Sequence, residues 1–371
     1  MPNPISAFFS KLFASNQGES IIGVDLGSSA IKVVQMKKKK GHAVLETYGE
    51  LALGPYANTE VGRATRLDAA TLVTALKDLW SIKEVNITSH SSGLAIPMRS
   101  SMVSVLTFPT NNSKQLEQMV PLEARKYIPV PISEVAMDWS VIPRVFEGDE
   151  ETAGTGKSEV LVVAIHNDTL SQFSQVCTGA ELNNSFYEIE MFGVMRALLD
   201  QGQIAPVLIV DMGAATSKSY IAEAGVVRES HIINRGSQDI TLNISTSMGV
   251  SIDQAEQLKR NFGQNKPEED KNIGDVASLV LDSIFSEINT VLMSFQRKYM
   301  KNVGKVILTG GGAALGGVAE RAQARLNIPT EIGNAFGKVQ VPAFLTDMLK
   351  VQGSGFSVAV GVALRKLQEL K

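Results

Sequence analysis

Two segments of this chain share one pattern, and the repeat constrains the fold more than any other feature of the sequence. Residues 21–36, IIGVDLGSSAIKVVQM, predict an apolar strand that ends at Asp25, a turn of small residues and a returning strand. Residues 207–219, VLIVDMGAATSKS, repeat the arrangement around Asp211, which follows Asp25 by 186 residues. That interval is about the length of one domain. One segment alone is typical of an ordinary β-hairpin, whereas the repeat predicts two lobes that hold one ligand between them.

The turns of these segments are suited to phosphate. They consist of small residues, which are Gly27, Ser28 and Ser29 in the first segment and Gly213, Ala214, Ala215 and Thr216 in the second. Small residues let a ligand approach the backbone closely and leave N–H groups available to anionic oxygens. Lys32 can add positive charge, and Lys218 has the same seven-residue spacing from its aspartate. Because Asp25 would repel phosphate, we expect it to hold Mg²⁺, through water.

Residues 305–317, KVILTGGGAALGG, form a third informative segment. An apolar strand ends at Thr309 and meets Gly310, Gly311 and Gly312, followed by small residues that can begin a helix. Such glycines let a phosphate, a base or a sugar lie close to the backbone. The segment lacks the GxGxxG spacing of dinucleotide-binding domains, and the chain lacks the GxxxxGK[ST] motif of P-loop ATPases. With the two hairpins, it predicts a nucleotide bound between the lobes.

The composition is typical of an intracellular globular protein with more than one domain. The 371 residues are 44% hydrophobic, so the chain can bury a sizeable core. A net charge of −3 gives no general attraction for nucleic acid, and we expect no such partner. Cys177 is the only cysteine, which excludes an intrachain disulfide and favours a reducing cytoplasm. No uninterrupted apolar run of about 18 residues occurs, so we expect no transmembrane helix.

The remaining patterns divide the chain into six parts. We expect an N-terminal amphipathic segment (1–18), a first-lobe core (19–100), an inserted strand–helix–strand–strand–helix subdomain (101–185), a helix back to the first lobe (186–205), a second lobe (206–340) with a mostly helical subdomain (237–300), and a C-terminal helix returning to the first lobe (341–371). The helix back to the first lobe is predicted to start near Asn184 and to contain Glu188 and Glu190.

Two further helices have clear sequence signals. Asp68 is expected to cap a helix with an apolar side formed by Leu72, Leu76 and Leu79. Residues 113–127 predict a helix that starts at a serine cap, Ser113, and is interrupted by Pro121.

The N-terminal segment, 1–18, places apolar residues on one face of a short helix, namely Ile5, Phe8, Phe9, Leu12 and Phe13. Such a helix could lie in a membrane interface, cover a hydrophobic groove, or be a docked or frayed terminus.

The three segments, in this order and at these spacings, resemble the actin-like ATPase superfamily of actin, hexokinase and the heat-shock chaperones. The residues at 25–29 match its first phosphate motif, 211–213 its second and 309–312 its adenosine motif. The inserted block resembles the small domain of the FtsA group. The segments IGVDLGSSAIKVVQ, VDMGAATSK, NRGSQDIT and AEQLKR are most similar to the PilM family of type IV pilus assembly proteins. The resemblance implies an α/β, two-lobed, actin-like (ribonuclease H-like) fold that binds ATP and Mg²⁺.

The resemblance also implies roles for single residues. Lys32 matches the phosphate-contacting lysine, and Asp25 and Asp211 match the carboxylates that organise magnesium, through water. Glu256 and Lys259 match positions that flank adenine and ribose, although this spacing is also that of a surface i,i+3 ion pair.

Glu190 matches a carboxylate near the attacking water in the chaperone-like members. The next residue is Met191, where those members carry proline, so the sequence predicts nucleotide binding but leaves hydrolysis open.

The resemblance to the PilM family implies a cytoplasmic scaffold at the inner membrane, attached through its partner. The implied partner is the cytoplasmic N-terminus of the membrane protein PilN, bound in a groove beside the inserted subdomain, with the assembly motor ATPases as further contacts. The sequence leaves the oligomeric state open.

Two other functions fit the same fold. One is an active ATPase or small-molecule kinase, although no aspartate base for a sugar hydroxyl stands out. The other is an FtsA-like filament former, which predicts polymers on adding ATP and a C-terminal membrane helix. The residues at 356–371 instead resemble a helix that packs on the first lobe.

Overall fold

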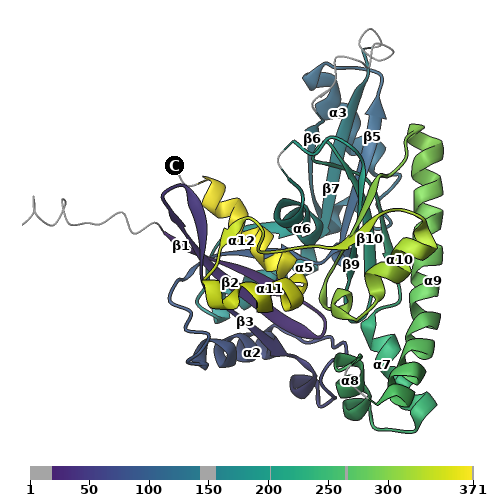
Figure 1. Ribbon diagram of the computed structural model, residues 1–371. Coiled ribbons are helices and arrows are strands. Elements are labelled where there is room, and N and C mark those ends of the chain that lie inside the picture. The colour runs from purple at the N-terminus through teal and green to yellow at the C-terminus, as the bar shows by residue number, and fades with distance from the viewer. Residues whose placement is uncertain (1–18, 143–155, 201, 264–265, 370–371) are drawn as a thin grey trace, which may run out of the picture.

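The computed structural model describes residues 19–142, 156–200, 202–263 and 266–369. The predicted amphipathic segment at 1–18 lies outside the described residues. Figure 1 shows two lobes next to each other and a smaller sheet-and-helix unit above them. Each of these three parts contains one sheet, with six, five and three strands.

The sheet of the first lobe has the order β14-β3-β2-β1-β4-β8. Its strands are β1 (Ser20–Leu26), β2 (Ala30–Lys39), β3 (His42–Ala52), β4 (Ser91–Ile96), β8 (Asn183–Ile189) and β14 (Val339–Gln340). β1 and β2 form the first predicted hairpin, in which Asp25 faces Lys32. The hairpin therefore presents its aspartate and its lysine at the same end of the sheet.

Helices α2 (Ala69–Ser81) and α5 (Asn167–Gly179) cover this sheet from one side. The predicted cap of α2 is confirmed, because the Asp68 side chain accepts a hydrogen bond from the Thr71 N–H. Its predicted apolar side is confirmed as well, since it buries Leu72, Leu76 and Leu79. Although the sequence grouped α5 with the inserted block, this helix packs against α2 in the core of the first lobe.

The sheet of the second lobe has the order β11-β10-β9-β12-β13. Its strands are β9 (Val207–Met212), β10 (Ser217–Glu223), β11 (Val226–Ile233), β12 (Lys305–Thr309) and β13 (Thr330–Ile332), and its helices are α7 (Ser237–Met248), α8 (Ile252–Arg260), α9 (Pro267–Tyr299) and α10 (Val318–Leu326). β9 and β10 form the second hairpin, and Asp211 faces Lys218. Parallel pairing of β12 with β9 places Thr309 beside Asp211.

Helix α9 has 33 residues and is long and apolar enough to cross a membrane by length and composition. It packs along the second lobe, where Ile273, Leu281, Phe285 and Phe295 are buried in the largest apolar core. Burial in a protein core accounts for the apolar residues on this face, whereas Leu279 and Met293 of the same helix are 72% and 54% exposed.

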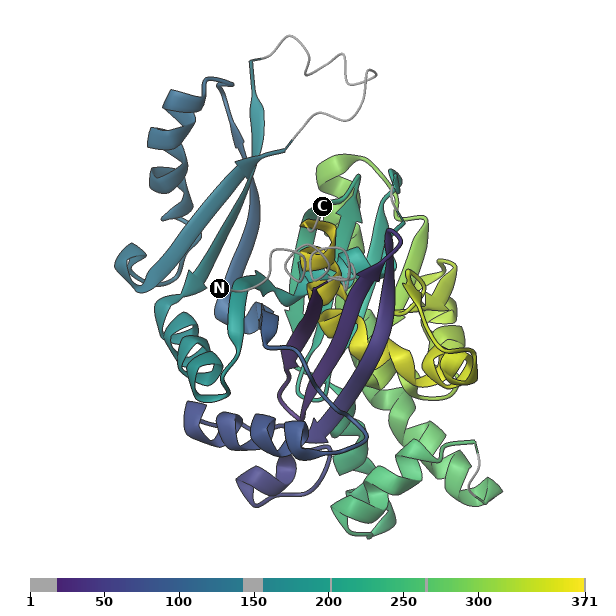
Figure 2. The same ribbon diagram turned by 90° about the vertical axis from the view of Figure 1, so that its left-hand side faces the viewer.

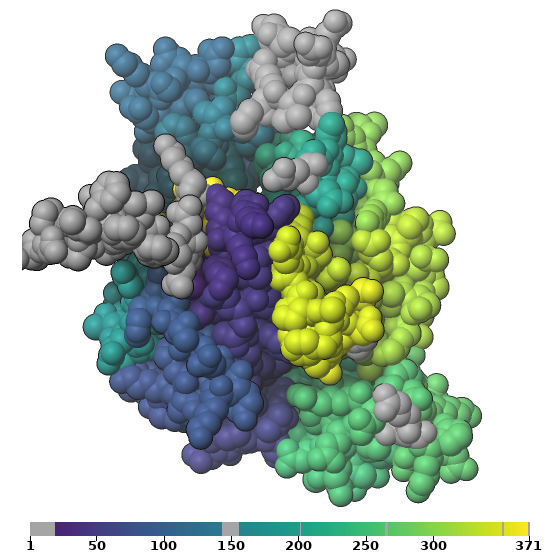
Figure 3. Space-filling view, turned by 60° about the vertical axis from the view of Figure 1, so that its left-hand side comes forward, coloured from purple at the N-terminus to yellow at the C-terminus, as the bar shows by residue number. Residues whose placement is uncertain are grey.

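The inserted subdomain consists of β5 (Ser101–Phe108), α3 (Ser113–Ala124), β6 (Val135–Val141) and β7 (Ser158–His166). Its sheet has the order β5-β7-β6, and its own apolar core includes Leu116, Val120 and Val160. Figures 2 and 3 show that it projects beyond the two lobes. Its strand β5 lies against β11 of the second lobe, and Glu159 of β7 forms a salt bridge of 2.6 Å with Arg228 of β11.

Helix α3 corrects two details of the prediction. Its cap is Asn112, whose side chain accepts hydrogen bonds from the N–H groups of Lys114 and Gln115, so Ser113 is the first helical residue and not the cap. The helix also continues through Pro121 to Ala124. Pro121 removes the hydrogen bond to the residue four positions earlier, and the helix ends at Ala124, within one turn of it.

The helix predicted within 184–201 is wrong in its first half. Residues Asn183–Ile189 form the strand β8, which pairs in parallel with β4, and α6 (Glu190–Leu198) starts only at Glu190. Pairing with a neighbouring strand overrides local helical preference. The buried Glu188 at the end of β8 is held by salt bridges to Arg196 and Arg365.

The C-terminal segment forms α11 (Thr346–Gln352) and α12 (Ser357–Glu369). α12 packs between β1 and α6, and small residues permit this close approach. A Cβ on Gly23 would lie 2.9 Å from the backbone nitrogen of Ala363, and one on Gly361 would lie 2.7 Å from the Cα of Gly193. The tight packing ties the end of the chain to its first strand.

Replacing Gly361 by alanine should therefore destabilise the protein, because the added methyl group would push α12 away from α6. Overpacking of a closed interface costs about 1–3 kcal/mol. We expect a lower Tm in thermal unfolding followed by circular dichroism. Gly304→Ala is the matched control, since a Cβ at Gly304 meets no atom within 4 Å. Equal losses in the two variants would contradict the role of this packing.

Candidate nucleotide site

The two hairpins form the same turn, although no sequence except the glycine is shared between the tips. The Gly27 N–H donates to the Ala30 carbonyl at 3.1 Å, and the Gly213 N–H donates to the Thr216 carbonyl at 3.0 Å. A Cβ on either glycine would lie 2.8 Å from that same carbonyl oxygen. Only glycine fits such a contact, so both tips keep their backbone open to a ligand.

The glycine-rich segment after β12 lies against the second hairpin. Gly310 has a φ of 83°, and a Cβ there would lie 2.6 Å from the Met212 carbonyl oxygen. The Gly310 N–H donates to the Ser354 carbonyl at 3.1 Å, and the Thr309 hydroxyl donates to the same oxygen at 2.9 Å. The segment is thereby fixed between the second hairpin and the C-terminal part of the chain.

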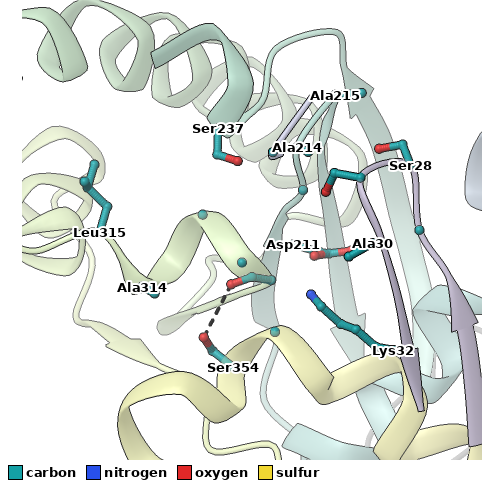
Figure 4. A pocket seen from close by; sticks show the side chains of 18 of the residues that line it. Ser28, Ala30, Lys32, Asp211, Ala214, Ala215, Ser237, Ala314, Leu315 and Ser354 are labelled. Carbon is teal, nitrogen blue, oxygen red and sulfur yellow. Dashed lines mark hydrogen bonds between the residues drawn. The ribbon is translucent and has the colours of Figure 1, made fainter. Parts of the chain in front are cut away.

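All the residues that the sequence assigned to the site line one cleft of about 640 Å³ between the lobes. They are Asp25, Gly27, Ser28, Ser29, Lys32, Glu190, Asp211, Gly213, Ala214, Thr216, Glu256, Lys259, Gly310, Gly311 and Gly312. The volume lies in the range of small-molecule and cofactor sites. Figure 4 shows Ser28, Ala214, Ala215 and Ser237 around one side of the cavity. The structure brings these residues together, while their contacts to a ligand stay predictions.

Lys32 extends from β2 into the cavity, as Figure 4 shows. Its Nζ lies 5.9 Å from the centre of the Phe356 ring, and it makes no salt bridge to any residue that the structure describes. A Cβ on Gly355 would come within 3.0 Å of this nitrogen. The ammonium group is thus placed beside the glycine-rich backbone and is available to an anion.

Glu256 and Lys259 lie in the cleft and not on the outer surface. Their side chains form a salt bridge of 2.7 Å and are only 8% and 12% exposed. Glu256 also accepts hydrogen bonds from Thr241 at 2.7 Å and from Arg260 at 2.8 Å. Burial raises the pKa of Glu256, but Lys259 and these two donors more than offset it and hold the pKa below its usual value. The alternative of a solvated surface pair is therefore wrong.

A loop of the first lobe reaches across the cleft at this end. The Ala64 N–H donates to the side chain of Gln238 in α7 at 3.1 Å, and a Cβ on Gly62 would lie 2.9 Å from the Glu256 carboxyl carbon. No sequence pattern predicts these contacts, because they join segments that are far apart in the chain. Phe262 and Leu315, which also line the cleft, were missed for the same reason.

Glu190 is buried at the N-terminus of α6, and both of its oxygens have partners. Oε1 accepts a hydrogen bond from the Met98 N–H at 2.7 Å, and Oε2 lies 2.9 Å from the Nζ of Lys218. The same nitrogen lies 3.1 Å from Oδ2 of Asp211. Burial lowers the pKa of Lys218, but Asp211 and Glu190 raise it by more, so this lysine stays charged. The sequence showed its spacing but not this contact.

Asp25 makes no salt bridge to the residues that the structure describes. Its pKa is raised from 3.8 to about 7, mainly because the surrounding protein removes water from the carboxylate. The neighbouring Glu190 and Asp211 raise it further, while Lys32 and Lys218 lower it. The cleft therefore resists a negative charge on Asp25 unless a cation is near.

The donor chemistry fits a magnesium ion held through water. Asp25 and Asp211 supply carboxylate oxygens at the floor of the cleft, and hard oxygen ligands with retained water are what Mg²⁺ prefers. Within the described ranges, no group of three or more His, Cys, Asp or Glu side chains forms a ready metal site. The protein alone thus offers outer ligands, and a bound phosphate would have to supply the others.

Comparison with known proteins agrees with this arrangement. A family model described as "Type IV pilus assembly protein PilM" matches residues 23–367. The chain belongs to the PilM family. Proteins of this family take part in type IV pilus assembly, and the resemblance inferred from the three motifs is confirmed.

Two cell-division proteins named FtsA are also similar to this chain. The protein of Neisseria meningitidis serogroup B is 23% identical over 336 residues, which cover 80% of this chain and 81% of the relative. The protein of Streptococcus pneumoniae is 23% identical over 373 residues, which cover 87% and 77%.

Solved structures confirm the two-lobed, actin-like α/β fold. A chain of a "PilM-PilN type IV pilus biogenesis complex" matches with a TM-score of 0.78 and 23% identity, covering 94% of this chain and 98% of that one. MreB5 of Spiroplasma citri bound to AMPPNP matches with a TM-score of 0.54 and 14% identity, covering 95% and 97%. Actin-like neighbours thus include a nucleotide-bound protein.

The shifted pKa of Asp25 predicts a pH-dependent stability of the ligand-free protein. The folded chain binds this proton more tightly than the unfolded chain, so the wild type should lose stability as the pH rises from 3.8 to about 7. Asp25→Asn removes this titration. We expect the difference in Tm, variant minus wild type, to become more positive as the pH rises from about 5 to about 8.

The exposed Asp347 provides the control for that experiment, since its side chain is fully accessible. Asp347→Asn should leave the pH dependence of the Tm unchanged. A constant difference between Asp25→Asn and wild type across the pH range would contradict the raised pKa.

Proposed function

We propose that this PilM-family protein binds ATP with Mg²⁺ in the cleft and serves as a cytoplasmic scaffold of type IV pilus assembly. In this proposal it binds the cytoplasmic N-terminus of PilN, lies at the inner membrane through that partner, and links it to the assembly motors. The observation that carries the proposal is that the nucleotide motifs and the inserted subdomain occupy separate parts of the molecule. The nucleotide motifs all line one cleft, whereas no described residue between 101 and 189 contributes to it.

The chemistry of the cleft supports the nucleotide part of the proposal. The open turns at Gly27 and Gly213 offer backbone N–H groups, and Lys32 offers an unpaired positive charge to phosphate oxygens. Glu256 and Lys259, at the end where the loop crosses the cleft, can hydrogen-bond the ribose and flank the base. Bound Mg²⁺ would neutralise phosphate charge, with Asp25 and Asp211 holding its water ligands.

The arrangement of Glu190 supports slow or absent hydrolysis. A general base must reach the proton of the attacking water and hold a negative charge that can accept it. The carboxylate of Glu190 is neutralised by Lys218 at 2.9 Å and bound by the Met98 N–H. Both oxygens of the carboxylate are therefore occupied and turned away from an attacking water, so we propose a role for ATP as a bound structural ligand.

The partner part of the proposal concerns the inserted subdomain. The similar solved structure is a complex of PilM with PilN. In the present chain, Leu122 and Tyr127 at the C-terminal end of α3 are 61% and 50% exposed. Exposed large apolar side chains are typical of sites that bind a peptide or a protein. We propose that they form part of the surface that receives the PilN peptide.

Replacing Lys32 by alanine should weaken ATP binding by about 10- to 100-fold, which corresponds to the loss of one charge-assisted hydrogen bond. Titration calorimetry with Mg-ATP measures this change. Lys37→Ala is the matched control on the same strand, because Lys37 pairs with Glu46 outside the cleft. Equal affinities of the Lys32 variant and wild type would refute the assigned role, and absence of ATP binding by wild type would refute the nucleotide site.

A synthetic peptide of the PilN cytoplasmic N-terminus should bind the full chain in the presence of ATP, and the double variant Leu122→Ser, Tyr127→Ser should bind it at least about tenfold more weakly. Fluorescence anisotropy of a labelled peptide gives both affinities. Met300→Ser is the control, since Met300 is equally apolar and 86% exposed at the end of α9. No binding to wild type would count against the PilN partner, whereas unchanged binding by the double variant would exclude only this surface.

A further inference from the structure

We infer that Lys218 is a resident cation of the cleft, whose ammonium group holds Asp211 and Glu190 together and prevents a divalent ion from binding directly to the carboxylates. The inference rests on the proposed nucleotide site for its consequences, but the contacts that carry it belong to the protein alone. It makes Lys218 a positioning residue for the cleft.

The two hairpin lysines have the same sequence spacing but different surroundings. Each faces its aspartate across a strand pair, Lys32 opposite Asp25 and Lys218 opposite Asp211. Lys32 points into the cavity and makes no salt bridge within the described residues. Lys218 is 16% exposed and forms two salt bridges, at 2.9 Å to Glu190 and at 3.1 Å to Asp211. The repeat therefore supplies one cation for a ligand and one for the protein.

The carboxylates around Lys218 come from three separate elements. Asp25 lies near the end of β1, Asp211 in β9 and Glu190 at the start of α6, and all three line the same cleft. Without Lys218, the carboxylates of Asp211 and Glu190 would repel each other in this poorly hydrated space. The ammonium group of Lys218 removes that repulsion, as a divalent ion with oxygen ligands would do.

The salt bridges also have a direct effect on metal binding. An ion that coordinates Asp211 and Glu190 would need oxygen atoms that now contact the Nζ of Lys218. A direct site that bridges Oδ2 of Asp211 and Oε2 of Glu190 therefore cannot form while the ammonium group keeps its position. It follows that Mg²⁺ reaches the cleft with the nucleotide phosphates, and that the ligand-free protein has no affinity for it.

Loss of the ammonium group should expose a new metal site. In Lys218→Met the linear side chain keeps much of its volume, but Asp211 and Glu190 lose the cation that pairs with both of them. We expect a lower Tm than wild type without metal and a rise of roughly 5 °C or more on adding millimolar Mn²⁺ or Mg²⁺. The Tm of ligand-free wild type should not change with either ion.

Two further variants make the result decisive. Lys301→Met removes a lysine that pairs with the buried Glu223 away from the cleft, so it should gain no response to metal. Combining Lys218→Met with Glu190→Gln removes one negative charge along with the positive one. This double variant should regain stability without metal and lose most of the response to Mn²⁺.

The outcomes separate the inference from the proposed function. A folded Lys218→Met protein that shows no change of Tm with Mn²⁺ would overturn the inference, as would a metal response of ligand-free wild type. If Lys218→Met folds only when Mn²⁺ is present, the inference is supported. If it fails to fold with and without Mn²⁺ while the double variant folds, Lys218 serves charge balance alone and no metal site exists.

A nucleotide experiment tests the consequence for ATP. Wild type should bind ATP in EDTA within about tenfold of its affinity in Mg²⁺, whereas Lys218→Met should lose more than about tenfold when Mg²⁺ is removed. If wild type binds no nucleotide at all, the proposed function fails while the metal response of the ligand-free variant still stands. Equal Mg²⁺ dependence in both proteins would contradict the role of Lys218 at the nucleotide site.

Discussion

The buried hydrogen bonds around the Ser354 carbonyl hold the cleft in its shape. Thr309 ends β12 of the second lobe, and its hydroxyl lies 2.9 Å from this carbonyl and 2.5 Å from the Ser357 hydroxyl. Ser357 begins α12, which packs against the first strand of the other lobe. A strand end of one lobe is thus fixed to the helix that belongs to the other. Buried polar groups of this kind are costly to leave unpaired, so the relative position of the glycine-rich segment and α12 is strongly specified.

The parts of the site that sequence could predict depend on local chemistry. A turn that opens with glycine and a strand that ends in aspartate are set by a few neighbouring residues, as at Gly27 and Gly213. The helix cap at Asp68 was predictable for the same reason. The prediction failed at Asn183–Ile189, where the partner strand β4 decides the structure and is distant in sequence.

The salt bridges of Lys218 could not be predicted from sequence either, because they depend on charges from other elements. Its spacing from Asp211 equals that of Lys32 from Asp25, and nothing within either hairpin distinguishes the two lysines. The difference arises because Glu190, from a third element, lies within 2.9 Å of one of them. Charge placement in a cleft is therefore a tertiary property. A match to a motif identifies the site but not the number of cations available to a ligand.

The hydrogen bond from Met98 to Glu190 connects the cleft with the base of the inserted subdomain. Met98 begins the single turn that leads into β5, the first strand of that subdomain. A shift of the Glu190 carboxylate would break this bond and free the backbone N–H from which the subdomain begins. One carboxylate oxygen that lines the cleft is in this way bonded to the base of a subdomain that contributes no described residue to the cleft.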